Sequence, residues 1–171
     1  NALTTSEEIR RFAASVFLSK EKFILEKTNL PRQSFYKELL EQLPKGNQML
    51  ILFPELFALK KFAGDIPLYH GDLKETEKAL LWKSVRDGKI CAVAGTRAAL
   101  FLPFKNLKHI VMDFEHNESY REKRQPAYHA KEIAEKLTQI LGASLSIISA
   151  SPRVESYFQA SRNNRIIPWE N

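Results

Sequence analysis

The run MLILF, residues 49–53, contains five consecutive apolar residues and is bounded by polar or turn-forming residues. An unbroken apolar run of this length is typical of a strand that is covered on both faces, as in a parallel sheet. Similar runs occur at ICAVA (90–94), LKHIVM (107–112) and SLSII (144–148), and FIL (23–25) predicts a shorter strand. The fold must therefore bury several whole strands.

Helical patterns separate these runs along the chain. Thr4 and Thr5 are candidate caps for a first helix, and Asp72 with Glu75 forms a second capping signature. Strands that alternate with helices favour an α/β fold, with a mainly parallel sheet between two layers of helices. Helices are expected near residues 7–17, 31–43, 54–62, 75–86, 126–141 and 152–160.

Length, charge and cysteine content restrict the classes of protein to which the chain can belong. The 171 residues suit a single domain (1–171), and a net charge of +6 fits a polyanionic partner. Cys91 is the single cysteine, which excludes an internal disulfide, and its apolar neighbours predict a buried side chain. The sequence has neither an apolar run that could span a membrane nor a signal peptide, so we expect a cytoplasmic protein. Because it starts at Asn1 instead of Met, we expect a fragment of a longer chain.

An acidic box, DFEH, follows the predicted strand at 107–112. Open α/β sheets place their ligands at the carboxyl ends of strands, so Asp113, Glu115 and His116 mark a candidate site. ATP hydrolysis needs one acid near Mg²⁺ and another to position water. Phe114 stands where the second acid is needed and cannot accept a proton. We expect Phe114 to pack against the sheet or to fill the nucleotide pocket.

The loop EKTNLPRQS, residues 26–34, stands where a phosphate-binding loop would lie, between a strand and a helix. It contains no glycine, and Pro31 removes one N–H group, so it cannot wrap a triphosphate in the usual way. The residues at the nucleotide-binding positions are Thr28, Arg32 and Gln33, and Arg32 could still hold an anion at a helix start.

Several motifs together resemble one family. They are FPEL (53–56), YHGDL (69–73), GTRAALFLPFKNL (95–107), DFEHNESY (113–120) and SASP (149–152). This series is similar to the first motor lobe of the PriA-type primosomal replication-restart helicases of superfamily two. The resemblance implies a RecA-like three-layer sandwich, a P-loop NTPase fold with a degenerate phosphate loop. ATP and Mg²⁺ are the family's cofactors, but the degenerate site predicts that this chain needs none.

The resemblance also implies a DNA-binding surface. The FPEL and GTR segments match strand-backbone contacts, and residues 117–128 match an aromatic-rich loop in which Pro126 stands where Trp is usual. Base stacking should therefore be weaker, which leaves REKR (121–124) to act mainly by charge. Arg97 could equally be a structural hydrogen-bonder, and REKR a solvated face. The implied DNA-binding residues are Pro54, Glu55, Thr96, Arg97, Tyr120, Arg121, Lys123, Arg124 and Tyr128.

We therefore expect an ATPase-defective motor lobe that acts as a DNA-binding or scaffolding module in replication restart, with no intact catalytic residue. Its expected partners are single-stranded or forked DNA, the second helicase lobe, and primosome or single-stranded-DNA-binding proteins; no membrane is expected. The alternatives are an active but divergent helicase and a protein-interaction module without DNA binding. A divalent-metal site at the acidic box is a further reading, although neighbouring residues on a strand point to opposite faces. His70, His109 and His129 are expected to be ordinary, partly buried histidines.

Overall fold

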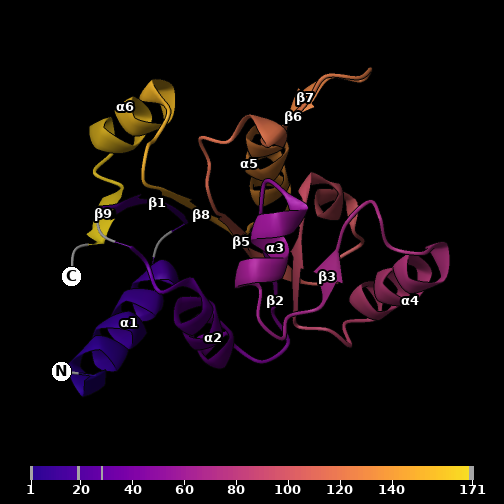
Figure 1. The fold of residues 1–171 in the computed structure, drawn as a ribbon, viewed down its shortest axis with the longest axis horizontal. Helices are drawn as coiled ribbons and strands as arrows, with labels where there is room; N and C mark the ends of the chain where they lie inside the picture. The colour runs from indigo at the N-terminus through magenta and orange to yellow at the C-terminus, as the bar shows by residue number, and fades with distance from the viewer. Residues whose placement is uncertain (1, 19, 28, 170–171) are drawn as a thin grey trace.

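The computed structural model describes residues 2–18, 20–27 and 29–169, with side chains described from residue 6 onward. Seven parallel strands form one sheet, in the order β3-β4-β2-β5-β8-β1-β9 (Figure 1). A two-stranded antiparallel hairpin, β6–β7, follows β5. The strands are β1 (Glu21–Glu26), β2 (Gln48–Leu52), β3 (Leu68–Tyr69), β4 (Ala92–Gly95), β5 (Leu107–Met112), β6 (Arg121–Glu122), β7 (Tyr128–His129), β8 (Ser144–Ser149) and β9 (Ile166–Trp169).

Helices cover both faces of the sheet, and β2 shows why its sequence is wholly apolar. Leu50 packs into a core with α4, α5 and α6, whereas the next residue, Ile51, packs into a core with α1, α2 and α3. Both side chains are fully buried. The predicted three-layer α/β sandwich is confirmed. The helices are α1 (Ala2–Val16), α2 (Arg32–Gln42), α3 (Leu56–Phe62), α4 (Glu75–Arg86), α5 (Ala130–Leu141) and α6 (Val154–Arg162), with 3-10 turns η1 (Arg97–Phe101) and η2 (Glu118–Tyr120).

The strand order positions the candidate site. Strand β8 lies between β1 and β5, so the carboxyl ends of these three parallel strands meet at one edge of the sheet. The loop after β1, the acidic box after β5 and the SASP segment after β8 therefore come together. This is the edge where α/β sheets bind ligands.

Three helix starts differ from the predictions. Thr4 and Thr5 lie inside α1, which already includes Ala2. Helix α4 begins after Lys74, whose N–H donates to the Glu77 carboxylate at 2.9 Å. The prediction that Asp72 and Glu75 cap this helix is therefore wrong. Helix α5 begins at Ala130, because residues 121–129 form the β6–β7 hairpin instead of an early helical turn.

Cys91 is exposed, because it lies just before β4 at the amino edge of the sheet, so its predicted burial is wrong. Among the residues that the structure describes, no helix is long and apolar enough to cross a membrane.

Candidate functional site

Arg32 lies at the meeting point of the β1 loop and the acidic box. Its guanidinium contacts Asp113, with Nε 2.7 Å from Oδ2 and Nη2 3.2 Å from Oδ1. On the other side it contacts Glu26, with Nη1 3.0 Å from Oε1 and Nη2 2.7 Å from Oε2. All three side chains are almost completely buried. Arg32 is therefore clamped between two carboxylates, in the paired, fork-like geometry that guanidinium groups favour.

Asp113 is saturated with hydrogen-bond donors. Besides Arg32, it accepts from the Tyr36 hydroxyl and from the Phe114 N–H at 2.8 Å. Burial raises the pKa of Asp113, while the bonds from Arg32 and Tyr36 act in the opposite direction. For Arg32, the bonds to Glu26 and Asp113 outweigh burial and hold its pKa above the usual range. Among the described residues, each Asp113 carboxylate oxygen thus accepts two hydrogen bonds from within the protein.

Two aromatic rings cover this network. The Arg32 guanidinium carbon lies 4.2 Å from the centre of the Phe114 ring and 5.3 Å from that of Phe62. Phe114 adopts a φ of 52°, which a bulky residue rarely does, and this turn directs its ring over the cluster. Phe114 is partly buried against the core that contains α1, α2 and α3, and its expected place in a nucleotide pocket stays a prediction. A cation–π contact here shields the buried charge from water.

The other predicted nucleotide-binding residues do not join the cluster. Gln33 is exposed and its side chain donates to the Lys61 carbonyl at 3.0 Å, which links α2 to α3. Thr28 lies outside the described residues. All three Arg32 nitrogens donate to protein carboxylates, so the anions that this guanidinium holds in the structure are Glu26 and Asp113.

The remaining acidic-box residues face different surroundings. The buried Glu115 carboxylate accepts from the Ser156 hydroxyl at 2.5 Å, and His116 Nδ1 lies 2.9 Å from Ser149 Oγ. Neither contacts Asp113. In the described part of the chain, no group of three or more histidines, cysteines or acids could hold a metal ion. The three residues of the acidic box therefore do not share one set of contacts.

The segments of the predicted DNA surface contact one another. Glu55 accepts from Asn117 Nδ2 at 3.1 Å and from Ser119 Oγ at 3.2 Å. Arg97 donates to the Ser119 carbonyl at 2.7 Å and to Glu122 at 2.8 Å. Arg97 therefore has the structural role that the sequence left open, which is to hold the β6–β7 hairpin beside the GTR segment. Pro54 is buried and Thr96 half-buried beside them.

The predicted DNA-binding residues between 120 and 128 differ in exposure. Tyr120 is fully buried, with its hydroxyl 2.9 Å from the Leu52 carbonyl oxygen and 2.5 Å from that of Asp113, so it has no free face for a base. Its predicted DNA contact does not fit the structure. Tyr128 is half-buried against the exposed Phe101 ring, at 5.7 Å between centroids. Arg121, Lys123 and Arg124 are exposed.

The sequence reasoning missed Glu26, Tyr36 and Phe62, which complete the Arg32 network. Tyr36 carried a usable signal, because it lies four residues after Arg32 and hence on the same face of α2. Glu26 and Phe62 carried none, because only tertiary packing brings the end of β1 and the end of α3 to Arg32.

No family model matches the chain. Individual relatives do. Replication restart protein PriA of Haemophilus influenzae is 34% identical over 138 residues, which cover 75% of this chain and 19% of the relative. PriA of Bacillus subtilis is 31% identical over 144 residues (79% and 18%). The chain is related to PriA. The predicted resemblance to the PriA family is confirmed, although the chain spans only about a fifth of the length of these relatives.

Solved structures support the fold predicted from the PriA resemblance. MrfA, a DUF1998 helicase solved bound to DNA, matches 97% of this chain and 27% of its own with a TM-score of 0.61 at 16% identity. The C-terminal domain of the Saccharomyces cerevisiae protein Dbp5 matches 89% of this chain and 91% of its own with the same TM-score of 0.61, at 14% identity. At these identities the comparison concerns the fold alone, and the RecA-like fold is confirmed.

Proposed function

We propose that this chain is the first motor lobe of a PriA-like replication restart protein and that it binds DNA without hydrolysing ATP. The proposal rests on the Arg32 network. A motor lobe must offer backbone N–H groups to phosphates, a lysine to the terminal phosphates and an acid to the hydrated Mg²⁺. Here the acid at that position, Asp113, is paired with Arg32 and capped by Phe114.

Opening the network for a nucleotide would be costly. Arg32 would have to leave two buried carboxylates, and breaking a buried ion pair costs about 3–5 kcal/mol. The water-positioning acid would still be missing, because Phe114 replaces it. The absence of a glycine-rich loop, the internal pairing of Asp113 and the loss of the second acid all act in the same direction.

The DNA-binding part of the proposal rests on the β6–β7 hairpin. Lys123 and Arg124 are exposed on it, and the Arg97–Glu122 pair at 2.8 Å fixes it beside the GTR segment. Exposed cations of this kind contact phosphates without reading sequence. Single-stranded or forked DNA is the proposed ligand. A second lobe of the parent chain and primosome or single-stranded-DNA-binding proteins are the proposed partners.

ATPase assays with Mg²⁺ and single-stranded DNA test the central claim. We expect no turnover above background and no change in Asp113→Ala. Phe114→Glu, which restores an acid at the catalytic position, should also remain inactive, because Asp113 is still paired with Arg32. DNA-dependent turnover that Asp113→Ala abolishes would instead establish the divergent-helicase alternative.

A further inference from the structure

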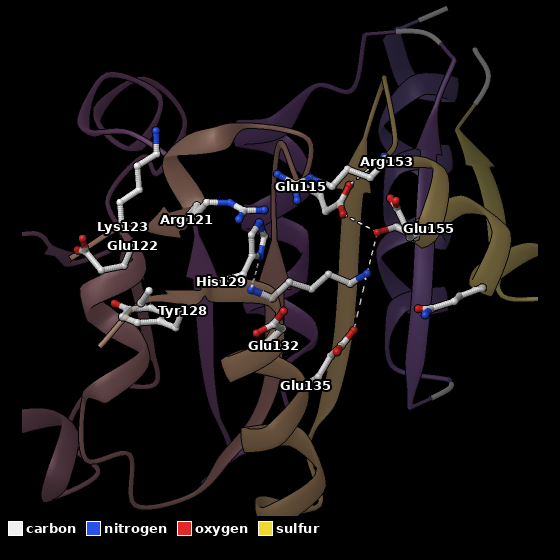
Figure 2. A pocket seen from close by; sticks show the side chains of 14 residues that line it. Glu115, Arg121, Glu122, Lys123, Tyr128, His129, Glu132, Glu135, Arg153 and Glu155 are labelled. Carbon is white, nitrogen blue, oxygen red and sulfur yellow. Dashed lines mark hydrogen bonds and ion pairs between the residues drawn. The ribbon is translucent and has the colours of Figure 1, made fainter. Parts of the chain in front are cut away.

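A pocket lies on the other side of the acidic box from the Arg32 network. It has a volume of about 700 Å³ and opens between the β6–β7 hairpin and the first turns of α5 and α6 (Figure 2). That volume lies within the range of small-molecule sites. Glu115 lines it, but the Ser156 hydroxyl already engages this carboxylate.

His129 presents an unused donor to this pocket. The side chain is 9% exposed, and its Nδ1 accepts the Lys131 N–H at 3.2 Å as the N-cap of α5. Nδ1 is therefore unprotonated, and the ring proton of the neutral imidazole sits on Nε2. Nε2 is buried and has no hydrogen-bond partner among the described residues. A buried donor of this kind calls for an acceptor oxygen supplied from outside.

Two arginines lie near that donor, and the acidic Glu132 and Glu115 act on His129 with the opposite sign. Arg121 is the direct cross-strand partner of His129 in the hairpin, so their side chains share one face. Arg153 is the N-cap residue of α6. Burial and then the charges of Arg153 and Arg121 lower the pKa of His129. The first turns of α5 and α6 add the positive ends of two helix dipoles.

Among the described residues, five glutamates also line the pocket, and Glu115 and Glu155 lie beside Arg153 (Figure 2). Glu132 and Glu135 lie toward the opposite end from Arg121 and Arg153 (Figure 2). Glu135 lies 3.7 Å from the Lys131 ammonium group.

Glu118 is not among the residues that line the pocket, but its carboxylate contacts both arginines. One of its carboxylate oxygens lies 2.9 Å from Arg153 Nη2, and the other lies 3.8 Å from Arg121 Nε. The Glu118 side chain is 74% exposed, so little packing holds it there. An exposed carboxylate in such a contact contributes little stability and is easily replaced.

We propose that this pocket binds a phosphate group through Arg121, Arg153 and the His129 Nε2–H, with Glu118 as the internal carboxylate that the phosphate displaces. Three donors from three elements suit a tetrahedral oxyanion with three free oxygens better than a carboxylate with two. The phosphate belongs to a nucleic-acid strand or is free in solution. Only the strand source rests on the proposed function.

Titrations of the full chain with inorganic phosphate and with a thymidine oligonucleotide test the proposal. His129→Asn keeps an N-cap acceptor but removes the Nε2–H donor, and we expect it to weaken phosphate binding by about tenfold. Glu118→Ala should tighten binding by several-fold because it frees both arginines. Glu155→Ala removes the same charge from the pocket wall without freeing Arg121 or Arg153, and it serves as the matched control.

Each outcome separates the two claims. Unchanged phosphate binding in His129→Asn, or equal effects of Glu118→Ala and Glu155→Ala, would overturn the phosphate site. If the oligonucleotide binds and the variants change neither its binding nor that of inorganic phosphate, the DNA role stands and the pocket does not. If inorganic phosphate binds with the expected changes and the oligonucleotide does not, the pocket stands as a free-phosphate site and the DNA role fails.

Discussion

Arg32 shows how one buried guanidinium can pair with two carboxylates at the edge where α/β sheets bind ligands. A guanidinium between Glu26 and Asp113 neutralises both buried carboxylates, and the Phe114 ring at 4.2 Å excludes water from the pair. The same residue that looked from sequence like a remnant anion ligand is thus an internal counter-ion. Its role is to stabilise the folded state.

Replacing Arg32 should be severe. In Arg32→Met, two buried carboxylates lose their partner, and we expect the free energy of unfolding to fall by about 3–5 kcal/mol. Urea unfolding measures this change. Arg11→Met is the matched control, because Arg11 pairs with Glu7 at 2.8 Å on the exposed face of α1, where such pairs contribute less than about 1 kcal/mol. Similar losses in the two variants would contradict the buried-network interpretation.

At the scale of elements, close backbone approach fixes the GTR segment. A Cβ atom on Gly95 would lie 2.4 Å from Ala99 Cβ and 2.8 Å from the Tyr69 carbonyl oxygen. The same carbonyl accepts the Thr96 N–H at 3.1 Å, so β3, β4 and η1 meet at this point. Only glycine allows that approach, and it sets where Arg97 starts its reach to the hairpin.

Gly95→Ala should therefore disturb both stability and the hairpin. Because the Ala99 Cβ and the Tyr69 carbonyl oxygen block the new methyl group, we expect a loss of about 1–3 kcal/mol in the free energy of unfolding. Gly71→Ala is the control, since nothing lies within 4 Å of a Cβ built there. Chemical denaturation of both variants checks this, and equal stabilities would refute the steric argument.

Helix α5 should make stability depend on pH through its cap. Burial, and then Arg153 and Arg121, lower the pKa of His129, so the folded state favours the neutral ring that accepts the Lys131 N–H. As pH falls below the ordinary histidine value of about 6.5, the unfolded chain takes up a proton that the folded chain resists. This contribution is therefore complete above that pH and decreases below it.

His129→Asn keeps a capping acceptor that does not titrate. We expect the loss of unfolding free energy between pH 7.5 and pH 5.5 to be smaller in this variant than in the parent chain. Part of the loss should persist, because burial and Lys108 also lower the pKa of His109. An unchanged difference between the two pH values would show that His129 does not contribute.

At the scale of the whole molecule, the hairpin that carries the predicted DNA contacts lies far from the first two helices (Figure 1). The β6–β7 hairpin projects from the opposite end of the molecule to α1 and α2 (Figure 1). A net charge of +6 attracts DNA to every face, so weak binding alone would not locate a binding surface. The salt dependence of binding reports the phosphate contacts that are actually made.

Lys123→Gln with Arg124→Gln should weaken binding to single-stranded DNA and reduce its salt dependence. Each lost phosphate contact should lower the slope of log K against log salt by about 0.7. Arg10→Gln with Lys37→Gln removes the same charge from α1 and α2 and should change the slope much less. Fluorescence anisotropy across a salt series measures both. A flat salt response of the parent chain would favour the protein-interaction alternative.

The sequence by itself determined the layers of this protein, because period and polarity are local properties. Five consecutive apolar residues at 49–53 require a strand buried on both faces, and β2 is such a strand, contributing to both cores. The sequence alone also showed that residues 26–34 contain no glycine and that Phe114 stands where an acid is needed, because both facts concern only which residue occupies a position. The sequence motifs also carried the resemblance to PriA.

Only the tertiary structure decided how charges pair and which side chains are free. Arg32 meets Asp113 because strand β8 lies between β1 and β5 and brings distant loops to one edge. The Tyr120 hydroxyl is buried against the Leu52 carbonyl, 68 residues away in the sequence. The His129 Nε2 is buried with no hydrogen-bond partner among the described residues. Pairing and exposure depend on long-range neighbours, which a local pattern does not encode.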